Sequence, residues 1–389
     1  MEAKPVLTVL DDEEAIGLLV AEVAEDMGYE VKTYTSVKDF KQNIAHDMEI
    51  LCLDLMMPEE DGIEVIRYLA TLNLKAQLIL MSGFDKRVLK SASIMAKTQG
   101  ITVAAELNKP FSIKLLQETI SNCKLPVVRS SSERKELSAE EIELAISEER
   151  VFVQYQPKID LAKNRVFGAE ALVRIRDQNN SIVPPGLFIS VAEKTGAIVA
   201  ITREVIKQSI AFCSRLKSLG YNLNVAINMP AQLLSDIRLT DELVSKIEAG
   251  GLEARNITVE ITESALVENY AVSLDVLTRL RMKGVLLSID DFGTGYSTMQ
   301  QLKNIPFTEM KLDQSFVKDI FEQDARVIIS KSIELGHELG LQVMAEGVET
   351  IEVARELMAQ GCDYCQGYYF SRPVDAEDFV DYLTAKTPL

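Results

Sequence analysis

Short hydrophobic segments of strand length alternate with amphipathic segments of helix length along almost the entire sequence. Five such strand segments occur before residue 125, and eight more follow residue 139. A helix between two strands allows those strands to pair in parallel, so this alternation predicts α/β folds. A chain of 389 residues also exceeds the usual size of a single hydrophobic core. We therefore expect two α/β domains.

The alternation is interrupted by the segment PVVRSSSERKELS at residues 126–138. This segment is polar, rich in serine and without hydrophobic periodicity, which is typical of a linker. The sequence thus predicts a first domain at residues 1–125, a linker at residues 126–138 and a second domain at residues 139–389.

The first domain is expected to be a doubly wound sheet of five parallel strands with helices on both faces. Its strand segments are VLTVL, YEVKTY, EILCLDL, AQLILMS and ITVAAEL. A helix-length segment follows each strand, for example GIEVIRYLATLNL after the third.

The second domain is expected to be a TIM-like (β/α)8 barrel, because helices separate most of its eight strand segments. These segments are FVQYQPK, VFGAEALVRI, LNVAIN, ITVEIT, VLLSID, EMKLD, QVMAE and CQGYYF. The first two are joined by a short hairpin around DLAKNR, so we expect one strand of the barrel to run antiparallel.

The charge of the chain restricts its partners. The net charge is −18, and the sequence contains no block of lysine or arginine, which argues against sequence-independent binding to nucleic acid or to an anionic membrane. No apolar segment approaches the roughly 20 residues of a membrane span, and the amino terminus lacks the features of a signal peptide. We expect a cytoplasmic protein that binds neither DNA nor membranes.

Polar side chains recur at or near the ends of strands in the second domain. They are Glu170, Asn228, Glu260, Glu263, Asp290, Asp291, Lys311 and Glu346. Each one taken alone is best interpreted as a solvated strand end. In a (β/α)8 barrel, however, the carboxyl ends of the strands meet at one mouth, where active sites lie. We therefore expect these residues to share a pocket.

Five of these carboxylates repel one another in one pocket unless cations bind among them. They are Glu170, Glu260, Asp290, Asp291 and Glu346. Oxygen ligands with one amide suit Mg²⁺ or Mn²⁺, and their number suffices for two ions. Asp290 is placed to bridge both ions and Asp291 to bind one. The glycines in the following GTG segment allow the next loop to fold close to the site.

A pair of divalent cations at this mouth favours phosphodiester hydrolysis. No histidine lies near these strand ends to act as general base, so a metal-generated hydroxide is the expected nucleophile. Lys311 is expected to orient the water or receive its proton, because neighbouring cations depress the pKa of an amine. Arg174 is expected to bind a phosphate oxygen of the substrate.

Several motifs of the second domain resemble those of the EAL-domain phosphodiesterases. The resemblance begins with Glu170-Ala171-Leu172 and Arg174, and it extends over residues 139–386. The other motifs are YQPK at 155, EITE at 260, DDFGTGYS at 290, KLD at 311, AEGVE at 345 and QGYYFSRP at 366. It implies hydrolysis of the bacterial second messenger cyclic di-GMP to linear 5'-pGpG with Mg²⁺ or Mn²⁺.

The resemblance assigns a role to each matching position. The implied metal ligands are Glu170, Asn228, Glu260, Asp290, Asp291 and Glu346. The implied catalytic group comprises Lys311, Glu349 and Glu263, of which Glu263 anchors the loop after Asp291. The implied substrate contacts are Gln154, Leu172, Arg174, Gln366 and Pro373. The sequence departs from the family pattern at Pro230, at Thr298 and in residues 175–180, but no catalytic group is missing.

The first domain resembles a two-component receiver, which has a flavodoxin-like fold. Acidic or polar groups follow its parallel strands, whose ends share one edge; they are Asp11, Asp12, Asp54, Ser82 and Lys109. A solvated acidic edge is the simpler interpretation, but a hydroxyl and a lysine beside the carboxylates favour a receiver pocket.

The receiver resemblance implies that one Mg²⁺ binds in this pocket and that a cognate histidine kinase supplies the phosphoryl group for Asp54. Glu106 departs from the pattern, because the family usually has an aromatic or histidine switch residue three positions before the pocket lysine.

The leading hypothesis is therefore a phosphorylation-regulated cyclic di-GMP phosphodiesterase that forms a homodimer or a higher homo-oligomer. The main alternative is an effector that binds cyclic di-GMP without cleaving it and acts through a protein partner. An unrelated metal-dependent barrel enzyme, such as an aldolase, is a third possibility. The retained metal ligands and Lys311 favour the hydrolase, because a receptor has no need of them.

Overall fold

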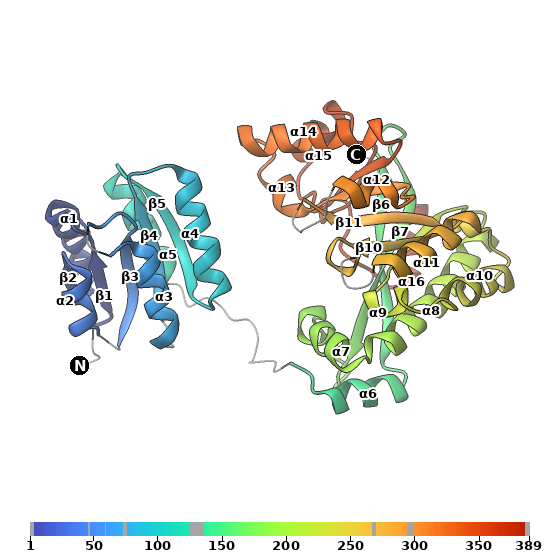
Figure 1. Ribbon diagram of the computed structural model, residues 1–389, viewed down its shortest axis with the longest axis horizontal. Coiled ribbons are helices and arrows are strands. Elements are labelled where there is room, and N and C mark those ends of the chain that lie inside the picture. The colour runs from blue at the N-terminus through green and yellow to red at the C-terminus, as the bar shows by residue number, and fades with distance from the viewer. Residues whose placement is uncertain are drawn as a thin grey trace. The chain divides into compact units, whose positions relative to one another are not determined.

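The structure is a computed structural model that describes residues 4–45, 47–58, 60–72, 76–124, 136–266, 270–293 and 299–385. The chain divides into two compact units, residues 1–133 and residues 134–389, whose elements are labelled in Figure 1. The predicted linker at residues 126–138 falls largely outside the described residues. No helix of the described segments is long and apolar enough to cross a membrane.

The first unit is a five-stranded parallel sheet with the strand order β2-β1-β3-β4-β5, which confirms the predicted fold. The strands are β1 (Val6–Leu10), β2 (Glu30–Tyr34), β3 (Met48–Asp54), β4 (Gln77–Ser82) and β5 (Thr102–Asn108). The helices are α1 (Glu14–Asp26), α2 (Val37–Gln42), α3 (Gly62–Leu72), α4 (Lys86–Thr98) and α5 (Ile113–Lys124).

Alternate residues of the central strand β3 pack into two different cores. Leu51 and Leu53 belong to one hydrophobic cluster, whereas Ile50 and Cys52 belong to another. Successive side chains of a strand point to opposite faces, so both faces of this sheet are buried. Asp54 ends the strand at its carboxyl edge, where the polar residues of this unit gather.

The second unit contains a closed barrel of eight strands. Its strand order is β6-β14-β13-β12-β11-β10-β9-β7, and β6 pairs with β7 to close it. Strand β6 runs antiparallel to both neighbours, as the DLAKNR hairpin predicts. The strands are β6 (Val151–Asp160), β7 (Arg165–Arg176), β9 (Asn224–Asn228), β10 (Ile257–Thr262), β11 (Leu286–Phe292), β12 (Glu309–Leu312), β13 (Gln342–Ala345) and β14 (Tyr364–Cys365).

Helices of the second unit follow most strands and cover the barrel (Figure 1). A capping box between Ser138 and Glu141 fixes where the first of them begins. The helices are α6 (Ala139–Ser147), α7 (Ile189–Thr195), α8 (Ile198–Ser218), α9 (Ala231–Leu234), α10 (Leu239–Ala249), α11 (Tyr270–Met282), α12 (Met299–Asn304), α13 (Gln314–Lys318), α14 (Gln323–Glu338), α15 (Ile351–Ala359) and α16 (Ala376–Thr384). Short 3₁₀ helices are Pro185–Leu187, Ala254–Asn256 and Ser264–Leu266.

Two details of the barrel differ from the sequence prediction. The segment CQGYYF is not a full strand, because β14 ends at Cys365. The chain turns there, and the backbone carbonyl of Gln366 accepts a hydrogen bond from the N–H of Val348. The next residue, Gly367, passes so close to Val348 that a β-carbon at this position would lie only 2.1 Å from the Val348 carbonyl oxygen. A short strand, β8 (Ile182–Val183), also pairs with β7 and was not predicted.

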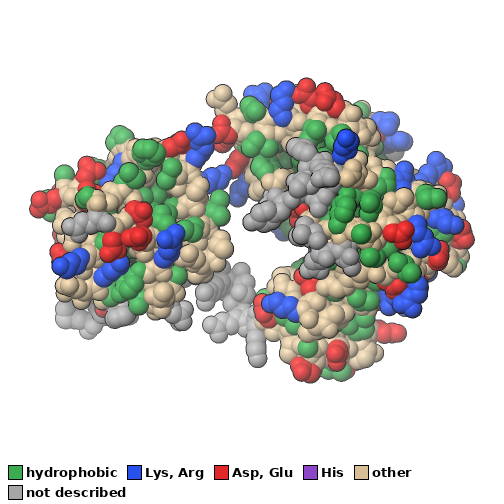
Figure 2. Space-filling view, viewed as in Figure 1, with side chains coloured by type: hydrophobic (Ala, Val, Ile, Leu, Met, Phe, Trp, Pro, Cys, Tyr) green, Lys and Arg blue, Asp and Glu red, His purple; other side chains and the backbone are tan. Residues whose placement is uncertain are grey.

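The surface carries charges of both signs. On the face shown in Figure 2, lysine and arginine side chains are interspersed with aspartate and glutamate. They do not form a large block of one sign there.

Candidate active site

A cavity of about 690 Å³ opens into the second unit at the carboxyl ends of the barrel strands. Most of the predicted site residues line it: Glu170, Leu172, Arg174, Asn228, Glu260, Asp290, Asp291, Glu346, Glu349 and Gln366. The residues come from strands that are far apart in sequence, as expected from the topology of a barrel. Lys311 lies beneath this lining and is almost completely buried.

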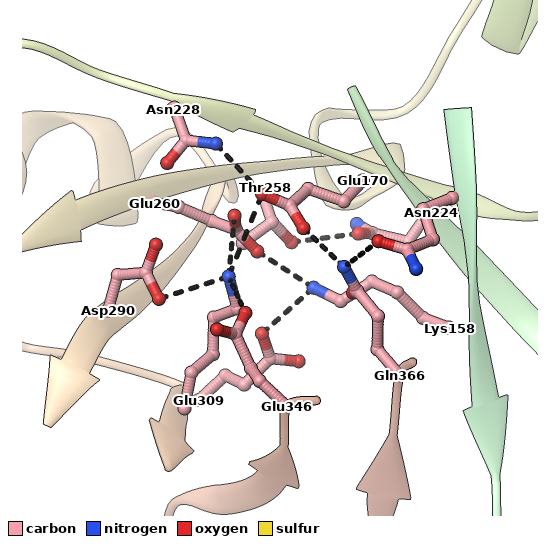
Figure 3. A network of polar contacts seen from close by, with 12 residues as sticks. Lys158, Glu170, Asn224, Asn228, Thr258, Glu260, Asp290, Glu309, Glu346 and Gln366 are labelled. Carbon is pink, nitrogen blue, oxygen red and sulfur yellow. Dashed lines mark hydrogen bonds and ion pairs between the residues drawn. The ribbon is translucent and has the colours of Figure 1, made fainter. Parts of the chain in front are cut away.

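Lys311 is the centre of the acidic cluster. Its Nζ atom lies 2.6 Å from Glu346 Oε1, 3.0 Å from Glu260 Oε2 and 3.1 Å from Asp290 Oδ1. Glu170 Oε1 is farther away, at 3.9 Å. One lysine therefore holds together carboxylates from four parts of the barrel, and Figure 3 shows these side chains converging.

The buried cluster contains carboxylates with opposite pKa shifts. Burial alone would raise the pKa of Glu260, but Lys158 and Lys311 outweigh it and lower that pKa to about 2. Burial raises the pKa of Glu346 to about 8, opposed by Lys311 and reinforced by Asp290 and Glu170. Burial likewise raises the pKa of Glu170. The cluster thus carries more acidic groups than its lysines neutralise.

Asp290 and Asp291 both face the site because the strand is irregular at this point. Ile289 pairs with Met310 and Phe292 with Leu312, so β11 contains one more residue than the facing part of β12. Such a bulge redirects side chains and is frequent beside active sites. Asp291 has a φ of 55°, in the left-handed region that non-glycine residues rarely adopt.

The bulge brings three carboxylates together. Oxygen atoms of Asp290, Asp291 and Glu346 all lie within 4.8 Å of one another. The backbone N–H of Asp291 donates a hydrogen bond to Asp290 Oδ1 at 3.0 Å, which fixes the first carboxylate relative to the second. Burial and the neighbouring Asp290 raise the pKa of Asp291. Two adjacent aspartates thereby serve one site.

Glu263 contacts the backbone of the segment that follows the aspartates. Its Oε1 accepts a hydrogen bond from the N–H of Gly293 at 3.1 Å, and its side chain is buried. Gly293 has a φ of 96°, which favours glycine at this position. The rest of the segment for which we predicted anchoring, residues 294–297, lies outside the described residues, as does Thr298.

Amides hold Glu170 from two sides. Asn228 Nδ2 donates to Glu170 Oε1 at 2.9 Å, and Gln366 Nε2 donates to Glu170 Oε2. Gln366 Nε2 also donates to Gln156 Oε1 at 3.0 Å (Figure 3 shows Gln366 beside Glu170). Gln156 was not predicted, although its alternation with Gln154 and Lys158 in FVQYQPK indicates a polar inner face of this strand.

Arg174 and Gln154 form a separate polar chain at the edge of the cavity. Arg174 Nε donates to Gln154 Oε1 at 2.9 Å, and Gln154 Nε2 donates to Asp375 Oδ1 at 3.1 Å. Burial lowers the pKa of Arg174 from its ordinary value, but the guanidinium remains charged in proteins. Of the other predicted substrate contacts, Pro373 is half-buried beside Val374, which pairs with Tyr155, and it does not line the cavity.

Lys158 was not predicted as a site residue. It extends from β6 into the barrel and is completely buried. Its Nζ atom lies 2.9 Å from Glu260 Oε1 and 3.1 Å from Glu309 Oε1. Dashed lines in Figure 3 mark these two contacts. Glu260 and Glu309 raise the pKa of Lys158 despite its burial, so the residue is a cation inside the barrel.

The first unit has its own acidic pocket at the carboxyl edge of its sheet. Lys109 Nζ lies 2.7 Å from Asp11 Oδ2, 3.0 Å from Asp54 Oδ2 and 3.3 Å from Glu13 Oε1. Carboxylate oxygens of Asp11, Asp12 and Asp54 lie within 4.8 Å of one another. The structure therefore brings the predicted acidic residues and Lys109 together.

Two further predicted residues lie near the ends of the neighbouring strands. Ser82 ends β4, is buried, and accepts a hydrogen bond on Oγ from the N–H of Phe84 at 3.1 Å. Glu106 lies in β5 with an exposed side chain. Glu106 is therefore solvated rather than packed into the unit.

Family comparison decides the class of the protein. The EAL domain family matches residues 139–373, and the response regulator receiver domain matches residues 7–121. The chain belongs to the EAL domain family. The EAL domain and the receiver domain correspond to the two compact units of the structure.

Two relatives differ in how much of their own length this chain spans. The cyclic di-GMP phosphodiesterase RocR of Pseudomonas aeruginosa is 31% identical over 342 residues, which cover 87% of this chain and 87% of RocR. The signaling protein YkoW of Bacillus subtilis is 38% identical over 240 residues, which cover 61% of this chain. The chain spans only 30% of the length of YkoW.

A solved structure resembles the EAL domain. The PaMucR phosphodiesterase in complex with c-di-GMP matches with a TM-score of 0.59 and 33% sequence identity, over 62% of this chain and 98% of that chain. The part of this chain that matches PaMucR is about as long as the EAL domain, residues 139–373.

The donor set of the EAL domain fits a divalent cation, and EAL domains are metal-dependent. Asp290, Asp291 and Glu346 offer clustered carboxylate oxygens, and Asn228 lines the same cavity. Oxygen ligands of this kind suit Mg²⁺ and Mn²⁺ and disfavour softer metals. The excess of carboxylates over lysines is a second reason for cation binding.

Proposed function

We propose that the EAL domain of this chain hydrolyses cyclic di-GMP to linear 5'-pGpG with two bound Mg²⁺ or Mn²⁺ ions. The observation that carries this proposal is the acidic cluster around Lys311 at the floor of a 690 Å³ cavity. The choice of cyclic di-GMP as substrate is supported by two similar proteins: RocR is named a cyclic di-GMP phosphodiesterase, and the PaMucR structure is a complex with c-di-GMP. The proposed role of the protein is therefore the removal of a bacterial second messenger.

The proposed ligands of the cations are Glu170, Asn228, Glu260, Asp290, Asp291 and Glu346. Bound Mg²⁺ or Mn²⁺ supplies Lewis acidity, which lowers the pKa of water and offsets the charge of the phosphodiester. The hydrogen bonds from Asn228 and Gln366 to Glu170, and from the Asp291 backbone to Asp290, hold the ligands in place. Glu349, which lines the cavity, is the further member of the catalytic group.

Lys311 acts as a donor in this proposal. Burial would lower its pKa, but Asp290, Glu170, Glu260 and Glu346 raise it well above its ordinary value. A protonated amine orients the attacking water and stabilises negative charge on the phosphoryl oxygens. From the sequence we expected neighbouring cations to depress the pKa of Lys311. Such a depression requires bound cations whose charge outweighs that of the surrounding carboxylates.

The substrate is held by residues at the cavity wall. Arg174, whose geometry is fixed by Gln154, is placed to bind a phosphate oxygen, since a guanidinium makes charge-assisted hydrogen bonds to phosphate. Leu172 and Gln366 line the same cavity and are the other proposed contacts, together with Pro373.

Regulation is proposed to come from the receiver domain. The acidic pocket around Asp54 holds one Mg²⁺, and Asp54 accepts a phosphoryl group from a cognate histidine kinase in the cytoplasm. Lys109 and Ser82 are the cation and the hydroxyl available to the phosphoryl oxygens. The proposed boundaries are residues 1–125 for the receiver domain, 126–138 for the linker and 139–389 for the EAL domain. The chain is also proposed to form a homo-oligomer.

A comparison of magnesium with calcium tests the proposed hydrolysis. We expect pGpG to accumulate when the protein is incubated with cyclic di-GMP and Mg²⁺, as measured by chromatography. Ca²⁺ should support substrate binding with little product, because it prefers longer bonds and more ligands. Binding in both ions without pGpG would instead identify a non-hydrolysing effector.

A further inference from the structure

Lys158 reaches across the interior of the barrel to strands that are not its neighbours. It lies on β6, which pairs with β7 and β14, whereas its partners Glu260 and Glu309 lie on β10 and β12. The side chain is completely buried, so these two ion pairs are shielded from water. A buried ion pair is costly to form and is weak support for stability in itself.

The two oxygens of Glu260 are held by two different lysines. Lys158 contacts Oε1 at 2.9 Å and Lys311 contacts Oε2 at 3.0 Å. A carboxylate that is restrained at both oxygens cannot rotate about its terminal torsion without losing one of these contacts. Glu260 lines the cavity, so its orientation determines which oxygen surface faces a bound cation.

Glu309 balances the charge of Lys158. It lies two residues before Lys311 on β12 and is mostly buried. The cavity lining does not include Glu309 among the described residues. The Lys158–Glu309 pair therefore adds no net charge beneath the acidic cluster.

We infer that Lys158 is a positioning residue that fixes the carboxylate of Glu260 for cation binding. The inference rests on the proposed function of the EAL domain, but it concerns a residue outside the proposed ligands. Partners of metal ligands typically change metal affinity or activity by about 10-fold to 100-fold when they are removed.

The test uses the full-length double variant Lys158→Met/Glu309→Gln, which removes one positive and one negative charge. The net charge beneath the site is thus preserved relative to the unmodified protein, while Glu260 loses the contact between its Oε1 atom and Lys158. The unmodified protein is therefore the reference of equal net charge, and Glu309→Gln alone is a second control that keeps Lys158. Mg²⁺ binding is measured by calorimetry without substrate, followed by kcat, KM and the melting temperature.

We expect the double variant to bind Mg²⁺ about 10-fold to 100-fold more weakly than the unmodified protein, with a lower kcat and a nearly unchanged KM. The receiver pocket is the same in both proteins, so its heat of Mg²⁺ binding is common to them. If the double variant matches the unmodified protein in Mg²⁺ affinity and kcat, Lys158 has no positioning role. Failure of the double variant to fold, when the control folds, would also overturn the inference by assigning Lys158 to stability.

The calorimetric comparison does not require hydrolysis of cyclic di-GMP. If the unmodified protein forms no pGpG, the proposed function fails, while the Mg²⁺ affinities still decide the role of Lys158. Normal turnover by the unmodified protein, with equal Mg²⁺ affinities in the unmodified protein and the double variant, would remove only the positioning role.

Discussion

At the scale of single residues, Asp290 is the group whose charge the proposed cation site needs most. It is close to Lys311, to Asp291 and to Glu346. We expect Asp290→Asn to lower kcat by more than about 100-fold, because a ligand should matter more than a residue that only supports one. The measurement is initial pGpG formation at saturating Mg²⁺.

The melting temperature of the same variant separates catalysis from folding. The cluster holds more carboxylates than lysines, so Asp290→Asn removes one repelling charge and should leave the melting temperature unchanged or raise it. Glu170→Ala provides a second loss of a proposed ligand. Turnover like that of the unmodified protein in either variant would rule out the assigned two-cation site.

The residues that the sequence reveals are those at strand ends. Glu346 follows a hydrophobic strand and Asp290 lies near the end of another. Strand ends meet at one edge of a barrel, so the proximity of these residues could be predicted. Lys158 could not be placed in the same way, because its partners lie across the barrel and contacts between non-neighbouring strands depend on the closed geometry. We expected a depressed pKa for Lys311 from the neighbouring cations alone. The structure shows that four carboxylates surround its amine and raise this pKa, and their arrangement could not be read from the sequence.

At the scale of elements, Glu263 contacts the backbone directly after β11. Its carboxylate accepts the N–H of Gly293, two residues after Asp291. We expect Glu263→Ala to lower both kcat and Mg²⁺ affinity, by about 10-fold or more, because the segment carrying the aspartates loses its support.

Glu263→Gln is the matched control for this prediction. The amide oxygen of glutamine still accepts the Gly293 N–H, so this variant should retain most of the activity that Glu263→Ala loses. Kinetics and calorimetry on both variants provide the measurement. Equal, unimpaired values in the alanine variant would show that Glu263 supports nothing in the site.

The positions of most elements follow from the hydrophobic pattern, but their irregularities do not. The strand segments of both domains correspond to strands of the structure, with β14 much shorter than CQGYYF suggests. The bulge in β11 was not predicted, because it depends on pairing with β12 and on the left-handed backbone of Asp291. Tertiary contacts, such as that of Gly367 with Val348, ended the last strand early.

At the scale of the whole molecule, the receiver domain is predicted to change the rate of the EAL domain. A phosphoryl group on Asp54 adds negative charge and acceptor oxygens beside Lys109, which now contacts Asp11 and Asp54. Lys109 and Ser82 must rearrange to meet the new oxygens, which shifts the ends of β4 and β5. Glu106 is exposed and carries no ring, so burial of an aromatic switch residue cannot transmit this change.

Beryllofluoride, a mimic of the phosphoryl group, tests this coupling. We expect the initial rate of pGpG formation to change when it is added with Mg²⁺, and to remain constant in the Asp54→Asn variant. Unaltered rates in the unmodified protein, with occupancy of the Asp54 pocket demonstrated, would assign the receiver domain to assembly rather than to control.

The most direct measurement is the number of pGpG molecules formed per protein molecule with cyclic di-GMP in large excess and Mg²⁺ present. We predict many turnovers, a linear initial phase that depends on Mg²⁺, and the loss of product formation in Asp290→Asn. Stoichiometric binding of cyclic di-GMP without any pGpG, under the same conditions and with Mg²⁺ binding confirmed by calorimetry, would contradict the proposed hydrolysis.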